Sequence, residues 1–140
     1  MTFLTQEDLQ TVMYQQFMTQ DGAANVSDII NNIENQNIAL IKSKLNGKFN
    51  TVSIFSATGG DRHWLIIKIL VRLVMYDFIR RNAARKVAQD LTQDWEWAMK
   101  MLESIKAGKE VPDGLPLQTD EDGNVPNITY GNNKNTDFYI

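Results

Sequence analysis

The sequence predicts an all-α protein, a small bundle of about four helices with a long central apolar helix and an extended C-terminal arm. Two observations carry this expectation. Along most of residues 5–108, apolar side chains recur at spacings of three and four, which is the period of a helix. After Gly108 the composition changes, because Pro, Gly and acidic residues punctuate a mostly polar segment.

The first helix is expected to begin after Thr5. A Thr N-cap with Asp8 at the third helical position is a variant of the capping box, and Leu4 and Leu9 have the spacing of a hydrophobic staple. The apolar face of this helix consists of Leu9, Val12, Met13 and Phe17. Asp21-Gly22 lies at or just after its end.

A second helix is expected from Asn25 or Ser27, either of which can cap it, to Asn46-Gly47, which supplies a left-handed stop. One face repeats every three or four residues and comprises Val26, Ile30, Ile33, Asn37, Leu40, Ile41 and Leu45. The next segment, residues 48–56, has β-prone side chains that do not alternate cleanly. We expect it to be an extended, partly buried connector.

The central helix is expected over about residues 61–81, entered through a Gly59-Gly60 turn with Asp61 as its cap. Its polar residues fall at steps of four and form one narrow stripe, Lys68, Arg72, Tyr76 and Arg80. Every other side is apolar, so this helix is expected to take part of its cover from neighbouring copies of the chain. A membrane span is not expected, because each charged residue near a bilayer centre costs roughly 2.5–3.5 kcal/mol.

A fourth helix is expected over about residues 88–107, with Gly108 as its C-cap. Its apolar side comprises Leu91, Trp95, Ala98, Met99, Leu102 and Ile105. Trp95 and Trp97 are two residues apart and therefore face different sides of the helix. One is expected in the core, and the other either packs at the periphery or contacts a partner.

The chain therefore divides into a helical domain, residues 1–108, and an extended polar arm, residues 109–140. The net charge of the whole chain is −3. The arm alone holds two Lys and six Asp or Glu, which is −4, so the helical domain carries +1. The arm ends in apolar and aromatic side chains that a solvated tail does not need, Ile128, Tyr130, Phe138, Tyr139 and Ile140. Docking of this end and disorder both stay open.

Catalytic and metal-binding motifs are not apparent. The chain has one His and no Cys, so His63 has no thiol to activate, and no serine elbow accompanies it. We interpret His63 as a residue of a helix N-terminal turn, and we expect neither enzymatic activity nor a cofactor. The basic cluster that ends the central helix, Arg80, Arg81, Arg85 and Lys86, fits either the helix dipole or contact with DNA phosphates.

Four segments resemble the head-completion or head–tail connector (neck adaptor) proteins of tailed phages and prophages, in the group of small Mu-like virion proteins. They are FLTQEDLQ at residues 3–10, IALIKSKLNGKFNTVSIFSATGGDRHWLI at 38–66, DWEWAMKMLESIKAGKEVPDGLP at 94–116 and ITYGNNKNTDFYI at 128–140. Together they span nearly the whole chain. The motifs in these segments are helix caps and turns, and they include no catalytic group. Trp64 departs from the Pro or small residue that such proteins have at the start of the central helix, and Asn133-Lys134 replaces a more usual Asn-Pro.

The resemblance implies a structural protein that forms a ring of about twelve copies between the portal and the tail or a second neck protein, through which DNA passes. It implies assembly in the cytoplasm of a bacterial host and a final place in the virion neck. The candidate contact residues for copies or partners are Trp64, Trp97, Tyr130, Phe138, Tyr139 and Ile140. The alternative is a small DNA-binding or packaging accessory module that uses the basic cluster.

Overall fold

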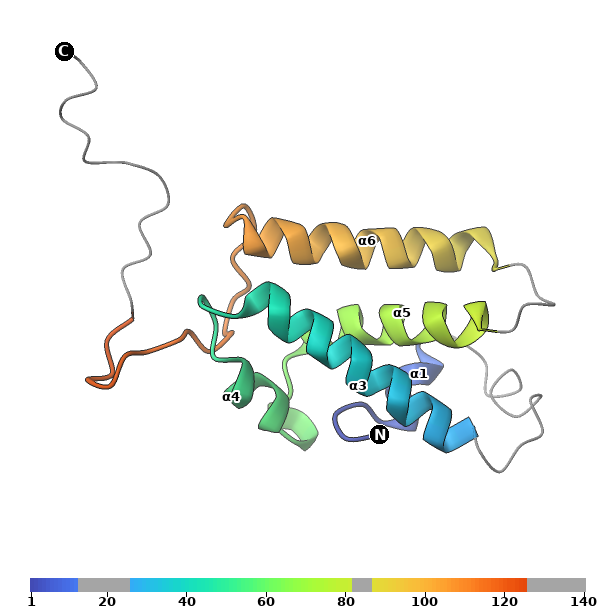
Figure 1. Cartoon of the computed structure of the whole chain (residues 1–140), viewed down its shortest axis with the longest axis horizontal. Helices are drawn as coiled ribbons and strands as arrows, with labels where there is room; N and C mark the ends of the chain where they lie inside the picture. The colour runs from blue at the N-terminus through green and yellow to red at the C-terminus, as the bar shows by residue number, and fades with distance from the viewer. Residues whose placement is uncertain (13–25, 82–86, 126–140) are drawn as a thin grey trace, which may run out of the picture.

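A computed structural model describes residues 1–12, 26–81 and 87–125 of the chain. It confirms the all-α prediction (Figure 1). The central helix, α5 (Trp64–Arg80), lies between α3 (Val26–Leu45) and α6 (Gln89–Lys106). Two short helices complete the body: α1 (Gln6–Gln10) packs on α5, and α4 (Thr51–Ser56) packs beside α3.

The N-terminal capping box is present as predicted. The Thr5 hydroxyl accepts a hydrogen bond from the Asp8 backbone N–H, and the Asp8 carboxylate accepts one of 2.8 Å from the Thr5 backbone N–H. The staple pair is also in place, since Leu4 and Leu9 are both buried. α1 itself covers only five residues. The predicted continuation through Met13 and Phe17 to Asp21-Gly22 lies outside the described residues.

A buried carboxylate on α3 holds the segment that leads into α1. Glu34 is fully buried, and it accepts hydrogen bonds from the backbone N–H groups of Thr2 at 2.7 Å, Phe3 at 3.0 Å and Leu4 at 2.6 Å. A carboxylate that accepts several N–H bonds has its oxygens satisfied away from water. The N-terminal residues therefore form part of the core, where Phe3 and Leu4 are both buried.

The segment between α3 and α5 corrects the prediction of an extended connector. Phe49 forms an isolated antiparallel bridge to Leu117. The chain then forms α4, because the Asn50 side chain accepts a 3.0 Å hydrogen bond from the Ser53 backbone N–H and caps a new helix. Ile54 of α4 is buried in the core.

The entry to α5 also differs from the prediction. Asp61 is the last residue of a short 3-10 turn, Gly59–Asp61, and does not cap the helix. The N-cap is His63, whose side chain makes no capping hydrogen bond. Its Nε2 instead lies 2.7 Å from the carbonyl oxygen of Asp113, at the start of the arm.

Much of α5 is buried within this chain, and cover of its remaining side chains by neighbouring copies stays a prediction. Nine of its side chains are buried within this chain: Ile66, Ile67, Ile69, Leu70, Val71, Leu73, Val74, Met75 and Phe78. They pack against α3 and α6 on two sides and against α1 on a third. The N-terminal segment and α4 add core residues that helical periodicity did not supply, so the body closes its own core.

α6 ends as predicted, with Gly108 in the left-handed region at φ +78°. The Gly108 N–H donates to the Ile105 carbonyl at 3.1 Å, and the Lys109 N–H donates to the Ser104 carbonyl at 2.9 Å. This pair of bonds is a Schellman motif. α6 is further tied to α3 by an ion pair between Glu103 and Lys44, which lowers the pKa of Glu103 through the hydrogen bond from Lys44 and its charge.

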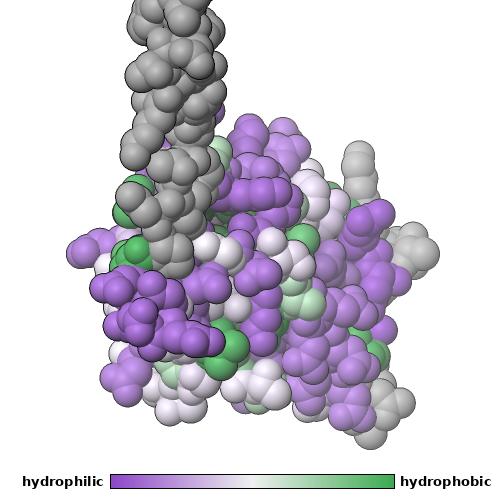
Figure 2. All heavy atoms as spheres, turned by 60° about the vertical axis from the view of Figure 1, so that its left-hand side comes forward, coloured by the Kyte–Doolittle hydropathy of each residue, from purple (hydrophilic) through white to green (hydrophobic). Residues whose placement is uncertain are grey.

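The first part of the arm lies against the helical body. Leu115 is buried, the Asn50 N–H donates to the Pro116 carbonyl at 2.9 Å, and the Gln118 N–H donates to the Lys48 carbonyl at 3.2 Å. Figure 2 brings this end of the molecule forward and shows apolar residues as small separate spots on a mostly hydrophilic surface. No helix among the described residues combines the length and the hydropathy that crossing a membrane requires.

Candidate interaction surface

The polar stripe of α5 meets α6 along a surface that is rich in aromatic and cationic side chains. We call it the α5–α6 seam, and it consists of Trp64, Lys68, Arg72 and Tyr76 of α5 with Trp95 and Trp97 of α6. None of these six residues is fully buried. The four α5 residues follow one another at steps of four, so they share one side of the helix. The buried residues of α5 and α6 set how the two helices pack against each other, and this packing sets the position of the seam.

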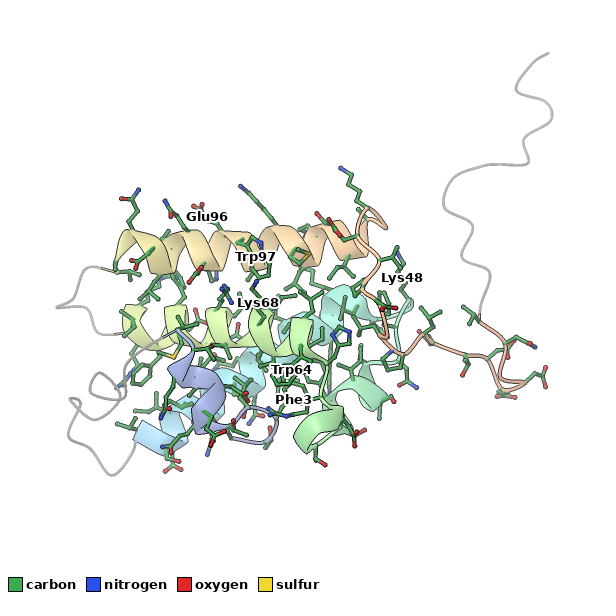
Figure 3. All side chains as sticks on the ribbon, turned by 180° about the vertical axis from the view of Figure 1, so that it is seen from behind. Phe3, Lys48, Trp64, Lys68, Glu96 and Trp97 are labelled. Carbon is green, nitrogen blue, oxygen red and sulfur yellow. The ribbon has the colours of Figure 1, made fainter. Side chains whose placement is uncertain are left out.

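Trp97 is the centre of the seam. The Lys68 ammonium lies 4.9 Å from the centre of its ring, and the Arg72 guanidinium lies 5.1 Å from it (Figure 3). Both distances are within the range of a cation–π interaction. Arg72 also bonds Asp94 of α6, with 3.3 Å between Nε and Oδ1, and donates to the Lys68 carbonyl at 3.2 Å. Two cations are thereby held at fixed positions beside an aromatic ring.

A second aromatic contact extends the seam toward the end of α5. The rings of Tyr76 and Trp95 stack with 5.2 Å between their centres and 28° between their planes. Trp95 and Trp97 are both partly buried and pack against the edge of the core. Both tryptophans therefore lie along the seam, and the prediction that one belongs to the core is wrong, because α6 rests on α5 along a strip between them.

Trp64 stands apart from these pairs, because 73% of it is exposed. It borders a shallow pocket of about 360 Å³ between α1 and α5, which we call the seam pocket. The lining residues are Asp8, Thr11, Val12, Trp64, Ile67, Lys68, Val71 and Arg72. A large ring left in water beside an apolar pocket is a common anchor for a binding partner.

The acidic residue in the seam pocket is already paired. The Arg62 guanidinium lies 2.5 Å from Oδ2 of Asp8 and also donates to the Phe3 carbonyl at 2.8 Å. Burial acts to raise the pKa of Asp8, but the hydrogen bonds from Arg62 and Thr5 and the charge of Arg62 lower the pKa below its ordinary value. Asp8 is therefore ionised and neutralised by Arg62, so Lys68 and Arg72 set the electrostatic character of the open side.

The other predicted site residues are not brought into the seam. Arg80 and Arg81 lie at the far end of α5, where the Arg81 guanidinium lies over the Phe78 ring at 5.2 Å. Arg85 and Lys86 lie outside the described residues, as do Tyr130, Phe138, Tyr139 and Ile140. Within residues 1–12, 26–81 and 87–125, His, Asp and Glu form no group of three that could hold a metal ion.

Sequence reasoning named Trp64 and Trp97 but missed the cations between them. From the helical pattern, Lys68 and Arg72 are predicted only to be solvent-facing residues of an apolar helix, without a role in binding. A signal was present, since Trp64 is four residues before Lys68 and so begins the same stripe. The position of Trp97 over that stripe carries no local signal, because it depends on how α6 packs on α5.

Comparison with known proteins adds no relative to this picture. No protein-family model, curated protein or solved structure matches the chain.

Proposed function

We propose that this chain is a structural assembly protein of the neck of a tailed phage or prophage. Copies of it form a ring between portal and tail, which completes the head and lets DNA pass. The proposal includes assembly in the bacterial cytoplasm and a final place in the virion neck. The resemblance of four segments to neck proteins supports this assignment.

The structural observation that carries the proposal is the α5–α6 seam. Exposed Trp64 lies beside the seam pocket and two ordered cations on a body that closes its own core. Tryptophan and arginine are enriched among the residues that dominate binding energy at protein interfaces. A surface of this kind on a compact body suits a subunit that contacts other proteins.

Deletion of the coding gene from the phage or prophage that carries it tests the proposal. We expect filled or leaking heads and free tails that do not join, seen by electron microscopy, and restoration by the wild-type gene. Complementation with Trp64→Ser should fail, whereas complementation with Lys106→Glu, an exposed change at the last residue of α6 and nine positions from Trp97, should succeed. Joined, infectious particles at normal yield in the deletion strain would contradict the proposed function.

The alternative is a DNA-binding or packaging accessory module. Arg80 and Arg81, both exposed at the end of α5, are the observation that favours it. Binding through phosphate contacts weakens steeply as salt rises. Tight, salt-sensitive binding of duplex DNA that is lost in Arg80→Gln/Arg81→Gln would support this alternative over the neck assignment.

A further inference from the structure

The arm ends, within the described residues, in a preformed acidic turn. Asp120 organises it: its N–H donates to the Asn124 carbonyl at 2.8 Å, its carbonyl accepts from the Gly123 N–H at 3.0 Å, and its Oδ1 accepts from the N–H groups of Asp122 at 3.0 Å and Asn124 at 2.7 Å. Gly123 has φ +80°, which a residue with a side chain rarely adopts. We call residues 119–125 the acidic tip.

The acidic tip presents exposed acidic side chains and an exposed apolar residue. Glu121 and Asp122 are exposed, and no cation among the described residues pairs with them. Val125, at the end of the tip, is 52% exposed. Because the turn is already ordered by Asp120, binding of the tip costs less conformational entropy than binding of a free peptide.

The tip does not lie on the seam of its own chain. The arm leaves the body beside α4, after the bridge between Phe49 and Leu117, and residues 119–125 then project away from the helices in Figure 1. In Figure 3, which shows the seam side, the same segment extends away from Trp64 and Lys68. A tip that points away from its own body is placed to reach another molecule.

The seam pocket offers the complementary charge. Lys68 and Arg72 border it, and in the part of the chain that the structure describes Lys68 has no carboxylate partner. The one carboxylate that Arg72 contacts among the described residues is that of Asp94, at 3.3 Å, and Asp8 is neutralised by Arg62. Trp64, Ile67 and Val71 supply apolar surface for a side chain such as that of Val125.

We propose that the acidic tip of one copy docks in the seam pocket of a second copy. Glu121 and Asp122 pair with Lys68 and Arg72, and Val125 packs against Trp64. This contact joins two different surfaces, so repetition of it gives a ring when the rotation closes. The inference rests on the proposed function, because it names the partner of the seam as another subunit.

Phosphates of a nucleic acid would also be attracted to Lys68 and Arg72. Asp94 of α6, which contacts Arg72 in the seam, would repel a continuous phosphate backbone. A short acidic segment that carries an apolar residue fits this mixture of charges better. We therefore favour the protein occupant, and we treat duplex DNA as the competing outcome of the test.

Charge reversal on the full-length chain tests the docking. In Lys68→Glu the pocket loses the cation that has no carboxylate partner among the described residues, and in Glu121→Lys/Asp122→Lys the tip loses its acidic charge. Light scattering should show association of the wild-type chain that weakens with salt, and roughly tenfold or greater weakening in each variant alone. An equimolar mixture of the two variants should regain association, because the intact tip of Lys68→Glu fits the intact pocket of the tip variant and the reversed tip and reversed pocket also carry opposite charges.

Lys106→Glu and Glu110→Lys/Asp113→Lys are matched controls, since they reverse the same numbers of charges at exposed sites on α6 and on the arm. Both should associate as the wild-type chain does. Loss of association in the controls as well would point to net charge and overturn the docking.

A second measurement locates the contact. We expect the indole N–H signal of Trp64 to shift in the NMR spectrum of the ¹⁵N-labelled tip variant when unlabelled Lys68→Glu chain is added. No shift up to about 1 mM, the limit of a weak contact, would overturn the docking. A shift with duplex DNA and none with the chain would also overturn it. Rings that assemble equally well from the variants would overturn the docking yet leave the proposed function standing, since the gene deletion tests that function independently.

Discussion

The Glu34 carboxylate accepts a 2.6 Å hydrogen bond from the Leu4 backbone N–H, so a fully buried side chain on α3 holds the start of the chain. The same carboxylate receives the N–H groups of Thr2 and Phe3. One side chain thus satisfies three backbone donors, of which those of Phe3 and Leu4 are buried. This arrangement places Phe3 and Leu4 in the core, and the capping box of α1 follows directly after it.

Glu34→Gln should lower the free energy of unfolding by about 1–3 kcal/mol, because the amide has one acceptor oxygen and turns an N–H₂ group toward backbone donors. Urea unfolding measures the loss. Glu7→Gln is the matched control, since Glu7 is exposed on α1 and should change stability little. Equal losses in the two variants would show that the hydrogen bonds to Glu34 do not hold the N-terminal segment.

The contact between Asp8 and Arg62 predicts loss of stability in acid. The pKa of Asp8 is lower in the folded chain than its ordinary value of 3.8, so the folded state binds its proton less readily than the unfolded state does. The stabilisation from Asp8 is present above the ordinary pKa and is lost as the pH falls through the lowered folded value. The difference in free energy of unfolding between wild type and Asp8→Asn should therefore shrink from about pH 5 to about pH 2. A difference that stays constant over this range would contradict the assignment.

Gly108→Ala should destabilise the chain by about 1 kcal/mol or more, because the Schellman motif requires its positive φ and a Cβ there would lie 3.1 Å from Nζ of Lys48. Gly60→Ala is the control. Gly60 lacks a positive φ, and a Cβ added to it would meet nothing within 4 Å. Thermal unfolding should show a lower midpoint for the first variant and no loss for the second. Similar losses of stability in the two variants would show that neither the positive φ of Gly108 nor its contact with Lys48 explains the destabilisation.

Self-closure of the core predicts that folding does not require assembly. Leu70 on α5 is fully buried within the chain, so Leu70→Ala should cost about 2–5 kcal/mol. In the Lys68→Glu background, where we expect a monomer, the free energy of unfolding should be independent of protein concentration. Stability that rises with concentration in this background would mean that another copy covers part of the core.

Local signals predicted much of the fold. The capping box at Thr5 and Asp8 and the left-handed glycines Gly47 and Gly108 lie where the sequence indicated. Each of these features depends on a few neighbouring residues, so spacing alone reveals it. The cap of α4 by Asn50 is also local, but the β-prone side chains around it suggested an extended segment instead.

Features that join distant segments could not be predicted in the same way. Glu34 looked like one of several polar residues on α3, and only its position beside residues 2–4 makes it structural. The cover of α5 was underestimated because the N-terminal segment and α4 add apolar residues outside any long periodic run. Lys68 and Trp97 are 29 positions apart in sequence, by subtraction of their numbers, so their contact depends on helix packing.

The presence of the chain in purified particles tests the central claim most directly. Quantitative mass spectrometry of virions from the encoding phage or induced prophage gives the copy number of this chain relative to the portal protein. We predict a fixed stoichiometry of about twelve copies of this chain per particle, as a closed ring requires. Absence of the chain from infectious particles would contradict its assignment as a structural protein of the neck.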